Sequence, residues 1–192
     1  EPVQQVAVST GTVLATGTVG PINPSVGLAK LWGYSVSNNT DLPKPAHWPA
    51  FTIEARRNKP VNVTYLNNLL DQTYASVNLI ADQTLHWAAP GGMEMMNMNP
   101  YTGPVPVVPH LHGGEVASES DGGPDAWFTP NKVYTGPSWG IDGTDENYHY
   151  HNLQEAATLW WHDHALGATR LNVYAGLAGF YFLKSDEEEA LR

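Results

Sequence analysis

The sequence predicts an all-β domain, an antiparallel β-sandwich or barrel. Glycine (18 residues) and proline (15 residues) are frequent and spread along the chain, which interrupts long helices. The apolar residues fall in short alternating or continuous runs, and Gly, Pro, Asn or Asp bound each run, as is typical of strands. The length of 192 residues fits a single domain over residues 1–192, large enough to bury a core without disulfides.

Five runs are the expected strands. "FTIEAR" (51–56) and "VNVTYL" (61–66) alternate and are rich in β-branched residues. In "PVPVVPHLH" (104–112) the prolines favour an edge strand or an irregular lead-in. "ATLWWHDH" (157–164) and "VYAGLAGFYFLK" (173–184) complete the set.

Two further segments are expected to lie outside strands. "ALGATRLN" (165–172) predicts a short helical turn, and "APGGMEMMNMNPYTGP" (89–104) predicts a long surface loop.

Charge and composition exclude several classes of protein. The formal net charge of −10 disfavours nucleic acid and anionic membranes as partners, because their phosphates would be repelled. The absence of cysteine excludes disulfides, thiolate metal sites and a cysteine nucleophile. No apolar run approaches the length of a membrane span, so none is expected.

Two His-x-His pairs, His110 with His112 and His162 with His164, carry the strongest chemical signal. Residues i and i+2 of a strand point to the same face, so each pair shares a face and Trp160 joins the second pair. Two such strands side by side would bring four imidazoles together, and neutral imidazole binds Zn, Cu, Fe and Ni. The pattern leaves open whether one ion or several bind there.

A third pair, His149 and His151, precedes Asn152, a residue typical of turns. Spacing alone does not exclude this pair as a metal site. It is equally compatible with the solvated face of a hairpin.

The motifs "HLHGG", "SDGGPDAWF" and "LWWHDHALGATRLNVYAGLAGFYFL" together resemble the first cupredoxin domain of a multicopper oxidase. The likeness is to the group of spore-coat laccase, bilirubin oxidase and phenoxazinone synthase. "LWGY" and "PAFTIEARRNKPVNVTYLNNL" agree with it, so it extends over about residues 31–183. The resemblance implies a cupredoxin-like Greek-key β-sandwich that is the first of three domains, with the remainder absent from this chain.

The resemblance also implies a set of copper ligands. In the family, eight histidines hold a three-copper cluster, four from the first domain and four from the last. By motif, His110 matches a ligand of the type 2 copper, and the matches to ligands of the type 3 pair are His112, His162 and His164.

The four other histidines match no family ligand. His149 and His151 fall where the family usually has other residues, so they are rejected as ligands of this cluster. His47 and His86 are interpreted as ordinary loop residues.

Asp121 in "SESDGGPDAW" is the candidate catalytic residue. The resemblance implies an aspartate near the cluster that helps to deliver protons or sets the charge there. The alternative is that Ser-Asp-Gly-Gly-Pro serves only as turn chemistry. Trp127 and Phe128, which follow, are expected to pack in the core.

The chain departs from the family in lacking the blue type 1 copper site. That site needs a cysteine thiolate, which the family carries in a C-terminal "H-C-H", and this chain has no cysteine. The chain can therefore hold at most one face of a copper cluster. The methionines Met93, Met95, Met96 and Met98 could bind Cu(I), but a loosely packed loop explains them more simply.

The expected function is that of the N-terminal domain of a laccase-like oxidase. It would supply half of the histidines of a trinuclear copper cluster that reduces O2 to water, and the isolated chain would be inactive. The expected partners are O2, the remaining cupredoxin domains, and a phenolic, bilirubin-like or metal-ion reductant at the absent type 1 site. The alternatives are a non-catalytic copper-binding subunit or carrier, and a mononuclear zinc enzyme. A secreted, periplasmic or spore-coat location is expected.

Overall fold

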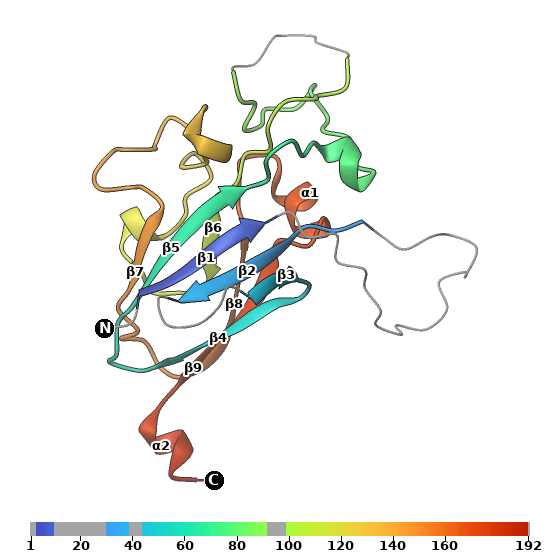
Figure 1. The fold of residues 1–192 in the computed structure, drawn as a ribbon. Coiled ribbons are helices and arrows are strands. Elements are labelled where there is room, and N and C mark those ends of the chain that lie inside the picture. The colour runs from blue at the N-terminus through green and yellow to red at the C-terminus, as the bar shows by residue number, and fades with distance from the viewer. Residues whose placement is uncertain (1–2, 10–29, 39–43, 92–98, 192) are drawn as a thin grey trace, which may run out of the picture.

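The chain folds into two β-sheets that face one another (Figure 1). The computed structural model describes residues 3–9, 30–38, 44–91 and 99–191. The first sheet has the strand order β3-β2-β1-β5-β7, and the second has the order β4-β9-β8-β6. The strands of the first sheet are β1 (Val3–Ser9), β2 (Gly33–Asn38), β3 (Lys44–His47), β5 (Val61–Asn68) and β7 (Asn147–Tyr150). Those of the second are β4 (Ala50–Arg56), β6 (Pro109–His112), β8 (Ala157–Asp163) and β9 (Ala178–Lys184).

Helical segments among the described residues are short and lie between or after the strands. Three are single 3-10 turns, and two are α-helices of six and four residues. They are η1 (Tyr74–Val77), η2 (Ser118–Ser120), η3 (Pro130–Lys132), α1 (Thr169–Tyr174) and α2 (Asp186–Glu189). None of these helices is long and apolar enough to cross a membrane.

The expected β-sandwich is confirmed, with one correction to its pairing. The sheets are mixed rather than wholly antiparallel, because β1 runs parallel to β5 and β4 runs parallel to β9. All five expected strands exist, although the proline-rich run is regular only over β6, an edge strand as its prolines predicted. Strands β1, β2, β3 and β7 were not predicted.

Two boundaries near the C-terminus were wrong. The helical turn expected at 165–172 is α1, which begins and ends later, and the strand expected from residue 173 begins only at β9. The chain turns between them at Gly176, which has a φ of +119°. A Cβ added at this position would lie 2.2 Å from the Trp32 carbonyl oxygen, so only glycine fits. Of the expected loop at 89–104, residues 92–98 with all four methionines lie outside the described residues.

Aromatic side chains fill the space between the sheets. Trp161 of β8 packs against Tyr34 of β2 at a centroid distance of 4.2 Å and against Tyr65 of β5 at 5.7 Å. The Tyr65 and Tyr150 hydroxyls share a hydrogen bond of 3.2 Å, and the Tyr181 hydroxyl donates to Asn152 Oδ1 at 2.7 Å. These three tyrosines therefore keep hydrogen-bond partners inside an apolar layer, whereas the buried hydroxyls of Tyr34 and Tyr74 have none among the described residues.

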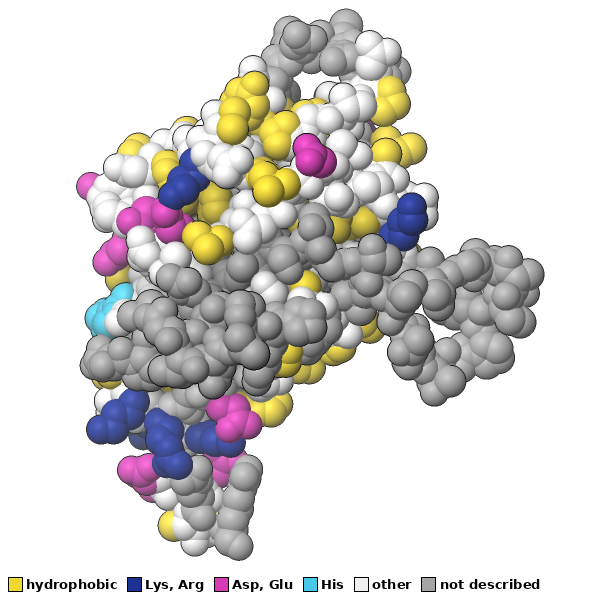
Figure 2. Space-filling model, viewed as in Figure 1, with side chains coloured by type: hydrophobic (Ala, Val, Ile, Leu, Met, Phe, Trp, Pro, Cys, Tyr) yellow, Lys and Arg dark blue, Asp and Glu magenta, His cyan; other side chains and the backbone are white. Residues whose placement is uncertain are grey.

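Charged side chains gather at the end of the sandwich that leads into α2. Figure 2 shows basic and acidic groups mixed there. Lys184 pairs with Glu54 at 2.7 Å, Arg57 with Glu155 at 2.7 Å, and Arg56 with Asp186 at 3.0 Å. These exposed pairs contribute little to stability and keep this end solvated.

The tyrosine core predicts a sharp alkaline unfolding transition. Burial raises the pKa of Tyr34, Tyr74, Tyr148 and Tyr150 well above the ordinary 10.0, and that of Tyr181 to about 12. Above pH 10 the unfolded chain releases tyrosine protons that the folded chain retains, so stability falls as pH rises. We expect tyrosinate absorbance to rise together with the loss of β-sheet circular dichroism. Gradual ionisation of all tyrosines while the circular dichroism stays native would contradict this packing.

Candidate metal centre

The strand register brings the two predicted histidine pairs together. Strands β6 and β8 are antiparallel neighbours, with His110 opposite His162 and His112 opposite Trp160. Leu111 and Trp161 alternate with the histidines and are buried in the sandwich. The imidazoles therefore project from the outer face of the second sheet, as the alternation predicted.

The four imidazoles form one cluster. The His110 ring centroid lies 4.8 Å from that of His164, 5.6 Å from that of His162 and 5.8 Å from that of His112. The ring of His162 lies 5.4 Å from that of His112 and 5.7 Å from that of His164. Ring nitrogens of His110, His112 and His162 all lie within 4.8 Å of one another, which suits metal binding.

Two of the rings are oriented by backbone carbonyls. His110 Nδ1 donates to the Asp121 carbonyl at 2.6 Å, and His162 Nδ1 donates to the Asp163 carbonyl at 2.7 Å. With the proton held on Nδ1, the lone pair lies on Nε2 of each ring. Fixing the tautomer through the second nitrogen is how proteins usually orient metal-binding histidines.

The rings of His112 and His164 also have nitrogens that could bind a cation. His112 Nδ1 and His162 Nε2 face each other at 3.1 Å, so the two atoms must share a proton or a positive ion. His164 Nδ1 is buried and has no hydrogen-bond partner among the described residues. A buried nitrogen without a hydrogen-bond partner costs free energy. An ion bound by this nitrogen would remove that cost.

Electrostatics keep the deeper rings neutral. Burial lowers the pKa of His162, and the neighbouring His110, His164 and His112 lower it further. Burial lowers the pKa of His164 as well, and His110 adds to the effect. Both imidazoles are therefore deprotonated at neutral pH, the form that binds metal.

Asp163, between His162 of β8 and His164 just after it, supports the cluster from the core and was not singled out as a site residue by the sequence. Its side chain is fully buried and accepts from Val108 N–H at 2.8 Å, Asn172 Nδ2 at 2.7 Å and Ala165 N–H at 3.1 Å. Burial raises the pKa of its carboxyl to about 7, although these three donors oppose the shift. Strict alternation, which turns the residue between two outward histidines inward, is the signal that could have found it.

Asp121 lies beside the cluster, as predicted. Its Oδ1 is 3.5 Å from His110 Nδ1, and its carbonyl accepts from the same ring nitrogen. The turn after it needs Gly122, because φ is +70° and an added Cβ would lie 1.8 Å from the Pro109 carbonyl oxygen. The turn therefore presses Asp121 against β6, next to His110.

The remaining predicted residues lie elsewhere. His149 lies on β7 and His151 lies just after it, in the other sheet. The neighbour of β7 is β5, which is distant in sequence, so β7 is not half of a hairpin. His86 lies in an exposed loop, and His47 ends β3 with a side chain outside the described residues. Trp127 and Phe128 are buried in the core, which confirms their interpretation.

No family model matches the chain. Individual relatives do. A laccase of Bacillus subtilis (strain 168) is 38% identical over 163 residues, which cover 85% of this chain and 27% of that protein. A laccase of Bacillus stratosphericus is 41% identical over 162 residues, which cover 84% of this chain and 26% of that protein. Multicopper oxidase LPR1 homolog 1 of Oryza sativa subsp. japonica is 36% identical over a match that covers 94% of this chain and 29% of that protein.

The chain belongs to the multicopper oxidase family. Solved structures agree on the fold. A laccase from Pediococcus acidilactici has a TM-score of 0.52 at 20% identity, with 97% of this chain and 27% of that chain covered. The McoA multicopper oxidase of Aquifex aeolicus has a TM-score of 0.52 at 15% identity, and the match covers 98% of this chain and 28% of that chain. The cupredoxin-like β-sandwich is thereby established.

This chain spans about a quarter of the length of the relatives that it matches. Copper is the metal that family membership implies. The donors fit it, because the cluster offers imidazoles with two oriented Nε2 atoms and one unsatisfied buried nitrogen.

Replacing Asp163 should destabilise the domain. In Asp163→Ala, three buried N–H donors lose their acceptor, so we expect a loss of about 3 kcal/mol or more in the free energy of unfolding. In Asp163→Asn, one oxygen remains an acceptor, so the loss should be smaller, about 1–2 kcal/mol. Urea denaturation measures both. Asp186→Ala, which removes an exposed ion pair, is the control and should change little. Equal effects of Asp163→Ala and Asp186→Ala would refute the role of the carboxylate.

Proposed function

We propose that this chain is the first domain of a laccase-like multicopper oxidase and supplies half of a trinuclear copper site. The observation that carries the proposal is the four-imidazole cluster on the outer face of one sheet. Three of its histidines lie on two adjacent strands, His164 follows β8 directly, and backbone carbonyls orient the rings of His110 and His162. Its relatives are laccases and multicopper oxidases, and the match covers 27% to 29% of their length.

Within that site, each histidine has an assigned part. His110 would hold the type 2 copper, and His112, His162 and His164 would hold the type 3 pair. Bound copper would supply the one-electron chemistry by which O2 is reduced to water at the expense of a phenolic, bilirubin-like or metal-ion reductant. The contribution of this chain is to hold the imidazoles in place, with the Nδ1 atoms of His110 and His162 bonded to carbonyls so that each Nε2 carries the lone pair.

Asp121 would act through its position next to His110. Its carbonyl orients the His110 ring, and its carboxylate places a negative charge 3.5 Å from the same ring. The carboxylate side chain is 44% exposed, so it can exchange protons with solvent. These features support the proposed part in charge balance and proton delivery at the cluster.

One side of the cluster is open. His112 is exposed, as are Trp160 and Phe180 beside it, at 37% and 48%. Phe180 lies opposite Trp160 on the neighbouring strand β9. An exposed aromatic patch next to half of a ligand set supports the proposal that a further cupredoxin domain covers this face and completes the site. A secreted, periplasmic or spore-coat location belongs to the same proposal.

Metal analysis of the longer protein tests the proposal. We expect more than one copper per molecule, and we expect His162→Ala to remove most of it, because that ring lies next to the other three rings of the cluster. His86→Gln, in an exposed loop, is the matched control. A single zinc ion that survives His112→Ala would instead identify a mononuclear zinc enzyme, and copper without oxidase activity would identify a carrier.

Asp121→Asn should separate copper binding from turnover. The substitution preserves the backbone carbonyl that orients His110 but removes the charge and the exchangeable proton. We expect full copper content and a kcat for O2 reduction lowered by about 100-fold. Unchanged turnover would reduce Asp121 to a turn residue.

The isolated chain should consume no O2. With one face of the ligand set and no cysteine for a thiolate–copper site, it has no group to receive electrons from a phenol. Copper-loaded chain should also lack the intense blue colour of such a site. Oxygen uptake with a phenolic reductant measures this, and sustained uptake would show that the chain is a self-contained enzyme.

A further inference from the structure

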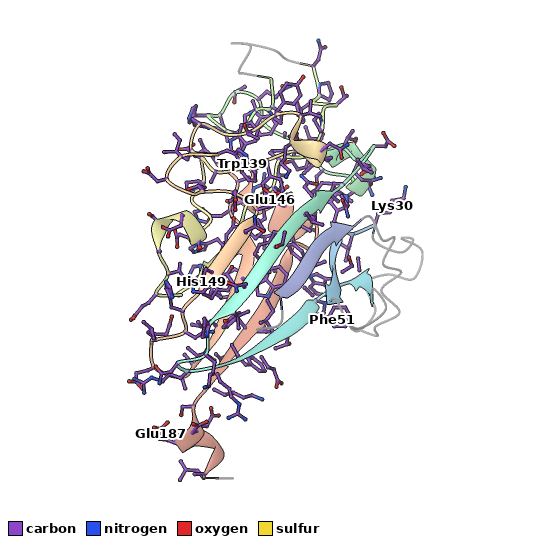
Figure 3. The ribbon with its side chains drawn as sticks, turned by 60° about the vertical axis from the view of Figure 1, so that its left-hand side comes forward. Lys30, Phe51, Trp139, Glu146, His149 and Glu187 are labelled. Atoms are coloured by element: carbon purple, nitrogen blue, oxygen red, sulfur yellow. The ribbon has the colours of Figure 1, made fainter. Side chains whose placement is uncertain are left out.

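A second pair of imidazoles lies on the opposite sheet. His149 of β7 and His151, which follows that strand, have ring centroids 4.4 Å apart. The residues that alternate with them, Tyr148 and Tyr150, are buried in the sandwich. Both imidazoles therefore project outward from the same strand face. Figure 3 shows His149 at the margin of the molecule, and Figure 2 shows a histidine side chain at the margin where Figure 1 places β7.

The ring of His149 is oriented as a metal ligand would be. Asn62 lies directly opposite it on β5, and His149 Nδ1 donates to Asn62 Oδ1. The proton on Nδ1 leaves the lone pair on Nε2. The backbone N–H of His149 donates to Ser120 Oγ at 2.9 Å, which holds the edge strand against η2. The strand that carries the pair is therefore anchored on both sides.

His151 supplies a second ring without such restraint. It is exposed, and its ring meets the ring of His149 at an interplanar angle of 79°. An exposed imidazole can turn about χ1 and χ2 to direct a nitrogen at an ion held by its neighbour. One fixed ligand and one adjustable ligand suit an ion that is captured from solution.

We propose that His149 and His151 form a surface site for a Cu²⁺ ion, separate from the histidine cluster on β6 and β8. Nε2 of His149 and one ring nitrogen of His151 would bind the ion, and water would fill its other positions. Imidazole nitrogen suits Cu²⁺, which also binds such sites most tightly among the first-row dications. With two protein ligands, this site is weaker than one built from four. The inference does not depend on the function proposed for the cluster.

The test is a titration of the 192-residue chain with Cu²⁺ alone, in a buffer without chelating groups. Electron paramagnetic resonance counts the imidazole nitrogens around the ion, and the selective broadening of histidine ring signals in NMR spectra identifies which rings bind. We expect two classes of Cu²⁺, and the weaker class should broaden the rings of His149 and His151.

Variants assign the weaker class. His151→Gln should weaken it by at least about tenfold, since losing a ligand costs no less than losing a ligand's hydrogen-bond partner. Asn62→Ala should weaken it by about tenfold, because the tautomer of His149 is no longer fixed. Thr64→Ala is the matched control, because it removes the neighbouring cross-strand bond to Asn147 (2.8 Å) and no imidazole contact.

Two further variants separate the sites. Replacing His110, His112, His162 and His164 by Gln should abolish the tighter class and leave the weaker one. If that variant does not fold, His149→Gln/His151→Gln gives the reciprocal answer, with the weaker class lost and the tighter class intact. The proposal is overturned if Cu²⁺ leaves the rings of His149 and His151 sharp, or if the weaker class survives their double replacement.

Discussion

The buried carboxylate of Asp163 is the interaction on which the candidate site depends. It binds three segments at once: the lead-in to β6 through Val108, the turn after β8 through Ala165, and helix α1 through Asn172. His164 N–H donates in turn to the Val108 carbonyl at 2.8 Å. Both strands that carry the imidazoles are thus tied to one point below the sheet. A carboxylate in an apolar layer is costly unless its oxygens are satisfied, and these donors come from the segments that must be held still.

The alternation of β8 explains why this polar group lies between two ligands. Two outward histidines at i and i+2 force the residue between them to face the core. An apolar residue there would bury well but would leave Val108 N–H, Ala165 N–H and the Asn172 amide without an acceptor. The same residue also orients His162 through its carbonyl. Asp163 therefore positions the imidazoles from within the core.

Local periodicity predicted a sandwich or barrel and placed each histidine pair on one face of its strand. That the two pairs meet was implied by the resemblance, because the pairing of β6 with β8 is not local. The period of two placed Trp161 inside and His162 outside, and the turn residues located β4, β5 and β8. The parallel pairing of β1 with β5 was not predictable, since it joins segments more than fifty residues apart and leaves no local pattern. Strand β7 was not among the expected strands, although "NYHYH" alternates tyrosines with histidines as a half-buried strand does and a hairpin was one interpretation of it. The helix α1 was misplaced because "TRLNVY" contains a β-branched valine that also suits a strand.

Trp160 packs against two imidazoles of the cluster and stays partly exposed. Its ring lies 4.2 Å from that of His162 and 5.2 Å from that of His112, nearly parallel to both at 30° and 33°. It therefore shields one flank of the imidazoles, yet is itself 37% exposed. A bulky indole exposed at this position costs hydration free energy unless another surface buries it. The exposed ring of His112 lies on the same side, and Phe180 lies opposite Trp160 on β9 and is 48% exposed. Under the proposed function, a further domain that buried Trp160 and Phe180 would therefore also reach His112.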